Sequence, residues 1–281
     1  MNDRNGALFS EGRGIIMMDK MILGRYIPGN SWLHRIDPRA KITAVMAFIA
    51  IVFLANNWLT YALMFAYVLY LVLTSKVPFL FFIKGLQPIF WLILITLLLQ
   101  VFFTKGGTVL VDLGLLQITT LGLTNGAMMF CRFVLIIFMT TLLTLTTSPI
   151  ELTDGLEKIL APFRLVHLPV HELALMLSIS LRFIPTLMDE TEKILKAQKA
   201  RGVEFTSGKW SDRIKAIIPL LVPLFISAFK RAEDLAIAME ARGYRGGKGR
   251  TRFRLLRWRF ADTFLLISLA VLSGLLFWLR S

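Results

Sequence analysis

The stretch Glu172–Gly202 reads "ELALMLSISLRFIPTLMDETEKILKAQKARG", and its character changes halfway along. The first half is apolar at helical spacing, whereas the second half is dense in charge. This pattern is typical of a helix that packs against something apolar at its start and reaches into water at its end. We therefore predict one long helix from His171 to Arg201, 31 residues or ~45 Å long at the usual rise per residue.

A second stretch repeats this plan 41 residues later. The apolar run "IKAIIPLLVPLFISAF" leads into the charged run "KRAEDLAIAMEARG", over residues 214–243, and the two apolar stripes coincide after the shift. Proline is expected to kink these helices, and it occurs at Pro185, Pro219 and Pro223. The sequence predicts two long helices of one design.

The composition is that of a membrane protein. The chain has 281 residues, 56% of them hydrophobic, which is far above the usage of a soluble domain. It also carries 32 Lys and Arg against 18 Asp and Glu. Basic residues on the cytoplasmic flanks of membrane spans explain this excess better than nucleic-acid binding does. The single cysteine, Cys131, excludes an internal disulfide and a cysteine-based zinc site.

Five apolar segments are long enough to be candidates for crossing a bilayer. They are Ala40–Trp58, Leu59–Ser75, Leu86–Phe103, Leu121–Leu145 and Phe260–Leu279. Asn56-Asn57 marks a turn between the first two segments, and residues 104–118 are predicted to be a loop. The predicted fold class is an all-α membrane protein with about five transmembrane helices plus long cytoplasmic or interfacial helices.

The distribution of basic residues predicts the topology and the domains. Positive-inside counting places the N-terminus and residues 148–259 in the cytoplasm, with Asn56 and Lys105 outside. The division is a polar N-terminal extension at 1–17, a membrane domain with four spans at 18–147, a cytoplasmic domain at 148–259, and a last transmembrane helix at 260–281.

No constellation of catalytic residues is found in the sequence. The fragments "SGKW" and "GGKGRT" lack the spacing of a P-loop, so no nucleotide site of that kind is expected. His167 and His171 are four residues apart, but Pro169 between them favours a helix start over a metal site. The acids Asp189, Glu190 and Glu192 are interpreted as a solvated helix face with neighbouring lysines. We expect no catalytic residue, no metal site and no cofactor in this chain.

Arg132 lies inside the fourth span, where a charge is costly. One interpretation is a partner carboxylate or carbonyl inside the helix bundle. The other is a side chain that snorkels toward the membrane surface. The sequence leaves both open.

Both long helices end in the same tripeptide, Ala200-Arg201-Gly202 and Ala241-Arg242-Gly243. For one such end, a glycine cap with a basic residue at the negative end of the helix dipole is a sufficient explanation. Two ends in matched register favour a second interpretation. The planar guanidinium can bond a carboxylate in two places, so each arginine is suited to enter an acidic groove on a partner.

These ends, together with two further stretches, resemble a known family. The chain is similar to the transmembrane T component of energy-coupling factor (ECF) vitamin and metal transporters over nearly all of Met18–Ser281. The resemblance rests on "GRYIPGNSWLHRIDPRAKI" at Gly24–Ile42, "LRFIPTLMDETEKILKAQKARG" at Leu181–Gly202 and "AMEARGYRG" at Ala238–Gly246.

The resemblance implies a coupling subunit of an importer in the bacterial plasma membrane. Each Ala-Arg-Gly end would dock on one of two ABC-type ATPase subunits, which would bind ATP and Mg themselves. The apolar surface of the two helices would hold a separate substrate-binding S component, and packing against the chain's own spans is the alternative for that surface. Our candidates for this docking surface are Leu173, Met176, Phe183, Ile217, Leu221 and Phe225.

Two other functional classes remain as rivals. A self-sufficient secondary transporter would carry intramembrane carboxylates and internally repeated spans. A membrane-embedded enzyme would need paired carboxylates, histidines or a metal site at the membrane face. Neither pattern is present in the sequence, which favours the coupling subunit.

Overall fold

The computed structural model describes residues 26–104, 106–112, 117–162, 169–203, 210–246 and 256–279. The chain divides into two compact units. The first, which we call the membrane unit, comprises Gly24–Ile159 and Leu255–Ser281. The second contains Leu160–Arg254 together with Met1–Leu23, and its described part is a pair of long helices. The predicted extension at 1–17, Lys105 and His167 lie outside the described residues.

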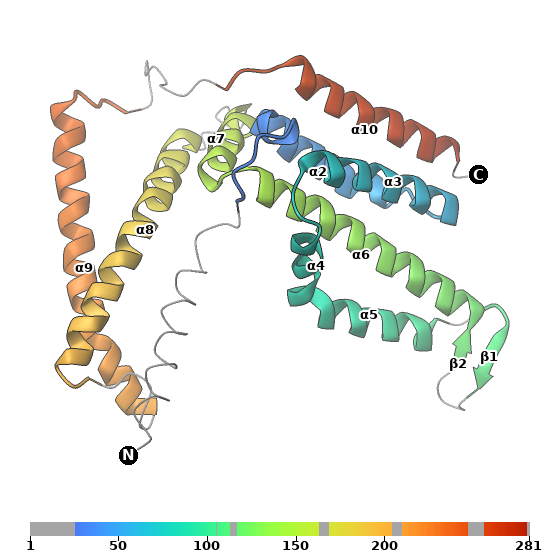
Figure 1. The fold of residues 1–281 in the computed structure, drawn as a ribbon, viewed down its shortest axis with the longest axis horizontal. Helices are drawn as coiled ribbons and strands as arrows, with labels where there is room; N and C mark the ends of the chain where they lie inside the picture. Colours follow the sequence, from blue (N-terminus) through green and yellow to red (C-terminus); the bar gives the residue numbers. More distant parts are fainter. Residues whose placement is uncertain are drawn as a thin grey trace. The chain divides into compact units, whose positions relative to one another are not determined.

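Helices make up most of the membrane unit (Figure 1). In chain order its elements are η1 (Leu33–Arg35), α2 (Pro38–Val52), α3 (Trp58–Ser75), α4 (Leu80–Leu86), η2 (Gln87–Ile89), α5 (Phe90–Phe103), β1 (Val109–Asp112), β2 (Gln117–Thr119), α6 (Thr120–Thr146), α7 (Pro149–Ile159) and α10 (Phe260–Trp278).

The predicted turn at Asn56-Asn57 is confirmed. Asn57 is the N-cap of α3, and its N–H donates to the Thr60 hydroxyl at 3.1 Å. The helix before the turn is shorter than the span predicted at Ala40–Trp58, because α2 already ends at Val52. Fifteen residues span only ~22 Å, less than the hydrocarbon core of a typical bilayer.

The loop predicted at residues 104–118 needs correction. Strands β1 and β2 pair in an antiparallel hairpin, with Val111 opposite Ile118 and Asp112 opposite Gln117. The third span also begins earlier than predicted, since α4 and η2 precede α5 and carry the helical path back to Leu80.

Large side chains from several helices fill the core of the membrane unit. Phe48 of α2, Met64 of α3 and Leu276 of α10 are each fully buried. Phe48 stacks on Tyr67, with ring centroids 6.5 Å apart, and the Tyr67 hydroxyl bonds Ser268 of α10 at 2.9 Å. Helices far apart in the sequence therefore pack as one bundle.

Five helices within the described residues are long and apolar enough to cross a membrane. They are Trp58–Ser75, Leu80–Phe103, Thr120–Thr146, Val170–Ala200 and Phe260–Trp278. The set differs from the predicted one at two places: α2 is too short to qualify, and α8, which we expected at the interface, does qualify. The all-α, multi-pass membrane fold predicted from the sequence is confirmed.

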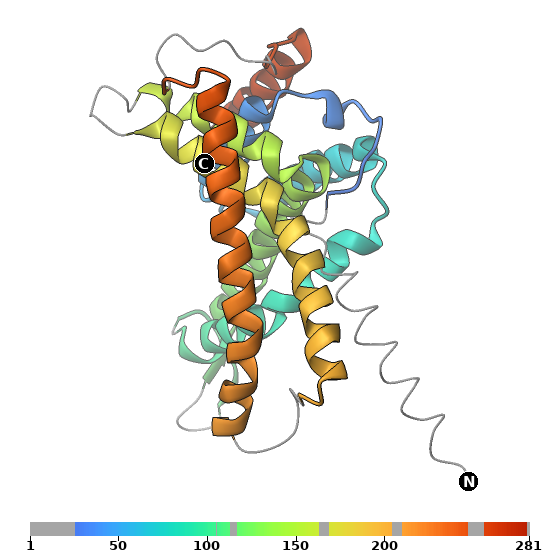
Figure 2. The ribbon, with the colours of Figure 1, turned by 90° about the vertical axis from the view of Figure 1, so that its left-hand side faces the viewer.

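The two predicted long helices are α8 (Val170–Ala200) and α9 (Trp210–Ala241), of 31 and 32 residues. Each continues through its internal prolines as one helix. They run in opposite directions (Figures 1 and 2), since Gln198 contacts Pro219 whereas Glu190, two turns earlier, contacts Arg231 further along α9. We call these two helices the α8–α9 pair.

Candidate functional site

Helix α8 ends in a complete glycine cap. Gly202 has φ +84°, a left-handed conformation that glycine adopts without strain. Its N–H donates to the Lys199 carbonyl at 3.0 Å, and the Val203 N–H donates to the Gln198 carbonyl at 3.1 Å. These two bonds define a Schellman motif, in which the backbone itself satisfies carbonyls left open at the helix end.

Helix α9 ends in the same motif. Gly243 has φ +75°, and its N–H donates to the Glu240 carbonyl at 2.8 Å. The Tyr244 N–H reaches the Met239 carbonyl at 3.0 Å. Both Schellman bonds of the first cap recur 41 residues later, so the repeated tripeptide encodes one repeated backbone geometry.

The side chains of the two arginines take no part in these caps. Arg201 and Arg242 are exposed, and neither guanidinium has a hydrogen bond or ion pair with another described residue. Because backbone N–H groups already satisfy carbonyls at both helix ends, capping requires the glycine and not the arginine side chain. The geometry leaves both guanidinium groups available to a partner.

The caps lie at opposite ends of the α8–α9 pair. Gln198, three residues before Arg201, donates to the Pro219 carbonyl at 3.4 Å, which places the α8 cap beside the first third of α9. From Pro219 to Arg242 the helix advances ~35 Å. The sequence did not predict this separation, because the spacing of apolar residues indicates a helix but does not show how two helices are oriented against each other.

Polar contacts fasten the pair near its middle. Glu190 accepts hydrogen bonds from the Ser227 hydroxyl at 2.5 Å and from Arg231 at 2.9 Å. The interpretation of Glu190 as part of a solvated face was therefore wrong, since its partners are on α9. The predicted i,i+4 pair of Glu192 and Lys196 is present at 2.8 Å.

The candidate docking residues are mostly exposed. Phe225 is 59% exposed and Met176 62%, whereas Phe183 is half-buried. Leu173, Ile217 and Leu221 are exposed too. Sequence reasoning missed further exposed apolar residues on the same two helices, which the continuous apolar runs could have indicated: Leu177, Ile218, Val222, Ile226 and Phe229.

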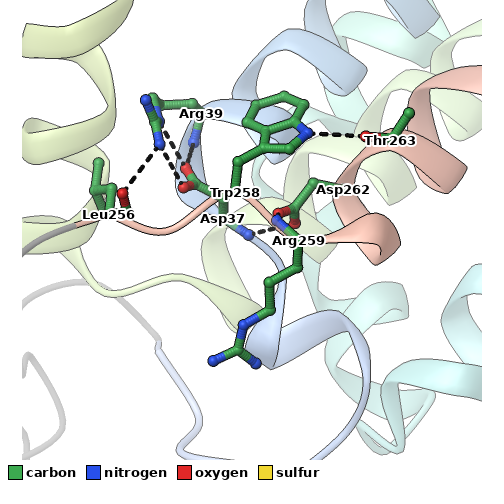
Figure 3. Close-up of polar contacts among 7 residues, drawn as sticks. All are labelled: Asp37, Arg39, Leu256, Trp258, Arg259, Asp262 and Thr263. Atoms are coloured by element: carbon green, nitrogen blue, oxygen red, sulfur yellow. Dashed lines mark hydrogen bonds and ion pairs between the residues drawn. The ribbon is translucent and has the colours of Figure 1, made fainter.

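A second polar site lies in the membrane unit, where α2 and α10 begin (Figure 3). We call Asp37, Arg39, Trp258 and Asp262 the Arg39 clamp. Arg39 donates from Nε and Nη2 to the two carboxylate oxygens of Asp37, at 3.0 and 2.9 Å. Its guanidinium also lies over the Trp258 ring, 5.8 Å from the centroid.

Asp262 completes the Arg39 clamp from α10. Its carboxylate accepts from the Asp37 N–H at 2.8 Å and from the Arg259 N–H at 2.6 Å (Figure 3). Asp262 is fully buried, and its bond with the Asp37 N–H is made away from water. One carboxylate therefore ties the start of α2 to the start of α10. Asp37 and Arg39 lie in the stretch Gly24–Ile42 that carries the family resemblance. Sequence reasoning missed Asp262, whose signal is an acid in the first turn of the last span.

Charge and burial act in opposite directions on Asp37. Burial raises the pKa of its carboxyl, and the hydrogen bonds and positive charge of Arg39 lower it by more, so the pKa lies below its ordinary value. Asp37 is therefore an ionised partner for Arg39 at neutral pH.

Two basic residues within the bundle have identified partners. Arg132 donates to the Tyr61 hydroxyl at 3.1 Å and lies 5.0 Å from the centre of the Phe53 ring. Its partner is thus a phenol and a ring, and not the carboxylate or carbonyl that we considered. Lys41 is buried, and its Nζ donates to the Thr146 carbonyl at 2.9 Å and to the Thr147 hydroxyl at 3.1 Å.

Comparison with known proteins identifies relatives over most of the chain. Residues 29–253 match the family described as CbiQ, cobalt transport protein. An energy-coupling factor transporter transmembrane protein EcfT of Listeria innocua is 99% identical over 265 residues, which are 94% of this chain and 100% of that protein. The EcfT protein of Bacillus subtilis is 57% identical with the same coverage.

A further relative is EcfT 1 of Listeria monocytogenes, 53% identical over 88% of this chain and 92% of its own length. The resemblance inferred from the arginine-glycine ends is thereby confirmed. The chain belongs to the CbiQ family, among the energy-coupling factor transporter transmembrane proteins of bacteria, and is a multi-pass protein of the cell membrane.

Proposed function

We propose that this chain is the scaffold and coupling subunit of an ECF-type ABC importer. It links ATP hydrolysis by two ATPase subunits to the movement of a separate S component, which binds the substrate. The observation that carries the proposal is the pair of identical caps at opposite ends of the α8–α9 pair, each with a guanidinium that has no partner among the described residues. ATP and Mg are bound by the ATPases.

The spacing of the caps suits two docks on two subunits. About 35 Å separates the caps along α9, which is roughly the diameter of a small domain. One small partner would not readily cover both ends, whereas two ATPase subunits side by side would take one arginine each. A carboxylate in each docking groove would accept two parallel bonds from the guanidinium.

The exposed apolar residues of the α8–α9 pair support a membrane-embedded partner. A surface with Met176 and Phe225 can repack against partners of different shape. We propose that Leu173, Met176, Phe183, Ile217, Leu221 and Phe225 contact the S component. The alternative function, a secondary transporter with its own solute site, has no specific observation in its favour among the described residues.

Substitution of the two arginines tests the proposal. Loss of one partner of a buried arginine–carboxylate pair costs about 2–5 kcal/mol. Arg201→Ala or Arg242→Ala alone should leave much of the complex assembled but cut transport sharply, and the double variant should lose the ATPases. Lysine should rescue poorly, because it keeps the charge and loses the fork.

The measurements are co-purification of the ATPases with the tagged chain and substrate uptake into vesicles. Arg245→Ala is the matched control, since Arg245 is exposed and lies just beyond the second cap. A double alanine variant that retains both ATPases and transports at the wild-type rate would contradict the proposal and leave the arginines as simple helix-end residues.

A further inference from the structure

The segment that follows α9 returns to the membrane unit. After Gly246, the next described residues are Leu256–Arg259, which lead directly into α10. Leu256 is 14 positions after Arg242. Even fully extended, 14 residues reach at most ~50 Å. The second cap is thus joined to the start of α10 by one short stretch of chain.

Three contacts fix Leu256–Arg259 where the segment meets the membrane unit (Figure 3). Arg39 Nη2 donates to the Leu256 carbonyl at 3.4 Å, and the guanidinium lies over the ring of Trp258. The Trp258 Nε1–H donates to the Thr263 hydroxyl at 2.8 Å. With the bond from the Arg259 N–H to Asp262, the backbone or side chain is held at three of four successive residues.

The Arg39 clamp is itself rigid. The Asp37 side chain that holds Arg39 is 1% exposed, and the backbone of Asp37 is bonded to the buried Asp262. A guanidinium held by two parallel bonds has one orientation, so it gives Leu256 and Trp258 a fixed position. Any pull on the segment therefore reaches the starts of α2 and α10 together.

The two caps differ in this respect. Arg201 stands at the far end of the 31-residue helix α8, and the chain continues from it into α9. Arg242 stands at the end of α9 that leads to the Arg39 clamp. Identical docks are consequently connected to the membrane unit through unequal lengths of chain.

We propose that Arg39 is a positioning residue for coupling: it anchors Leu256–Arg259 so that movement of the Arg242 end of α9 is passed to α2 and α10. This inference rests on the proposed function. Without the anchor, Leu256–Arg259 would lose its contacts with α2, and ATP would be hydrolysed with little transport.

The test compares Arg39→Ala with wild type in the full complex of this chain, the ATPases and an S component, reconstituted in vesicles. Arg35→Ala is the matched control, because Arg35 is exposed, lies four residues away, and makes no side-chain hydrogen bond or ion pair with a described residue. We measure ATPase co-purification, ATP hydrolysis and substrate uptake, and report the ATP hydrolysed per substrate imported.

Arg39→Ala should bind both ATPases and hydrolyse ATP, while the ATP used per imported substrate rises about tenfold, within the usual range of coupling changes. Arg35→Ala should match wild type. An unchanged ratio in Arg39→Ala overturns the inference, as does a loss of hydrolysis and uptake in equal proportion. A wild-type chain that binds no ATPase overturns the proposed function as well.

A cross-link separates coupling from folding. In a Cys131→Ser background, Arg39→Cys with Trp258→Cys removes the contacts of the Arg39 and Trp258 side chains, and a short bis-maleimide joins the two positions again. The untreated variant should show the raised ratio, and the cross-linked protein should return toward the wild-type ratio. A ratio that the cross-link leaves raised shows that the anchor is not what couples, and it overturns the inference.

Discussion

The membrane unit has phenylalanines both on its surface, such as Phe90 and Phe277, and in a core, whereas no described phenylalanine of the α8–α9 pair is buried. In the membrane unit, Phe48 and Phe82 are fully buried by the chain itself. On α9, Phe225 and Phe229 are 59% and 73% exposed. Lipid can cover apolar residues of a membrane span, but α8 and α9 end in charged, arginine-tipped halves that prefer water. The membrane unit thus has a core of its own, whereas the exposed apolar residues of the α8–α9 pair fit the docking of partners that we propose.

The largest expected effect is at Phe48. Phe48→Ala removes a fully buried ring that stacks on Tyr67 and leaves a cavity between α2 and α3, so we expect a loss of about 3 kcal/mol in stability. Phe225→Ala in the isolated chain should change stability little. Thermal unfolding in detergent measures both. Equal losses of stability in Phe48→Ala and Phe225→Ala would contradict this expectation, since they would show that the chain also buries Phe225.

Asp262 provides the next largest effect. Asp262→Ala removes a buried carboxylate that accepts from two backbone N–H groups, those of Asp37 and Arg259, at a cost of about 2 kcal/mol. The control is Asp234→Ala, an exposed acid on α9, which should be within experimental error of wild type. The same unfolding assay decides the matter, and a silent Asp262→Ala would show that the Arg39 clamp contributes no stability.

A substitution at Phe225 tests whether the exposed apolar surface of the α8–α9 pair binds the S component. Phe225→Asp places a charge on the exposed apolar surface, so binding of the S component should weaken about tenfold, or ~1.4 kcal/mol. The ATPases should stay bound, because the caps are unchanged, and Met176→Asp should behave alike. Co-purification of each partner with the variants is the measurement. Loss of both partners together would indicate misfolding and would contradict a specific docking role.

Substitution of glycine by alanine should change stability in opposite directions at the two caps and inside a helix. Gly202→Ala and Gly243→Ala force a side chain into a left-handed conformation at a cost of about 1 kcal/mol each. Gly274→Ala in α10 should stabilise by a similar amount, since no described atom lies within 4 Å of the added Cβ. Hydrogen exchange of the amides in the last helical turn detects the first effect, and thermal unfolding detects the second. Stable alanine variants at both caps would mean that the Schellman bonds are dispensable.

The smallest effect is the pH dependence of the Arg39 clamp. The pKa of Asp37 is lower in the folded protein than in the unfolded chain. Its contribution to stability is therefore fully present above the pKa of the unfolded chain and is lost as pH falls through the pKa of the folded protein. His34 adds to this trend, since burial lowers its pKa and protonation favours the unfolded chain. The stabilities of wild type and Arg39→Ala are compared at about pH 7 and at about pH 3. The difference in stability between the two proteins should be smaller at the lower pH. A difference that grows in acid would contradict this assignment.

Helix lengths and end motifs could be predicted from the sequence, because both depend on residues close in the chain. The limits of α8 were predicted to within one residue, and the turn before α3 was identified from Asn56-Asn57. The hairpin of β1 and β2 was missed, although Val109–Val111 has strand character. A stretch that short does not distinguish a loop from a strand until its pairing partner is known.

Contacts between distant residues could not be predicted in this way. The opposite placement of the caps depends on how α8 and α9 cross, and the Arg39 clamp depends on residues 225 positions apart. Arg39 and Asp37 both lie in a stretch that carries the family resemblance, yet nothing in a local pattern names Asp262 or Trp258 as their neighbours. Buried polar residues find partners wherever the fold brings them, so their pairing belongs to the tertiary structure.

The buried polar groups at the start of α2 have partners that are synthesised much later in translation. Lys41 emerges from the ribosome 105 residues before the Thr146 carbonyl that it bonds, and Asp37 emerges 225 residues before Asp262. At the usual 5–20 residues per second these delays are roughly 5–20 s and 10–45 s. During that time the Lys41 ammonium and the Asp37 N–H lack these acceptors. Helix α2 therefore gains its last buried polar contact only after the start of α10 has been made, and a chain that stops before α10 lacks the Asp262 acceptor.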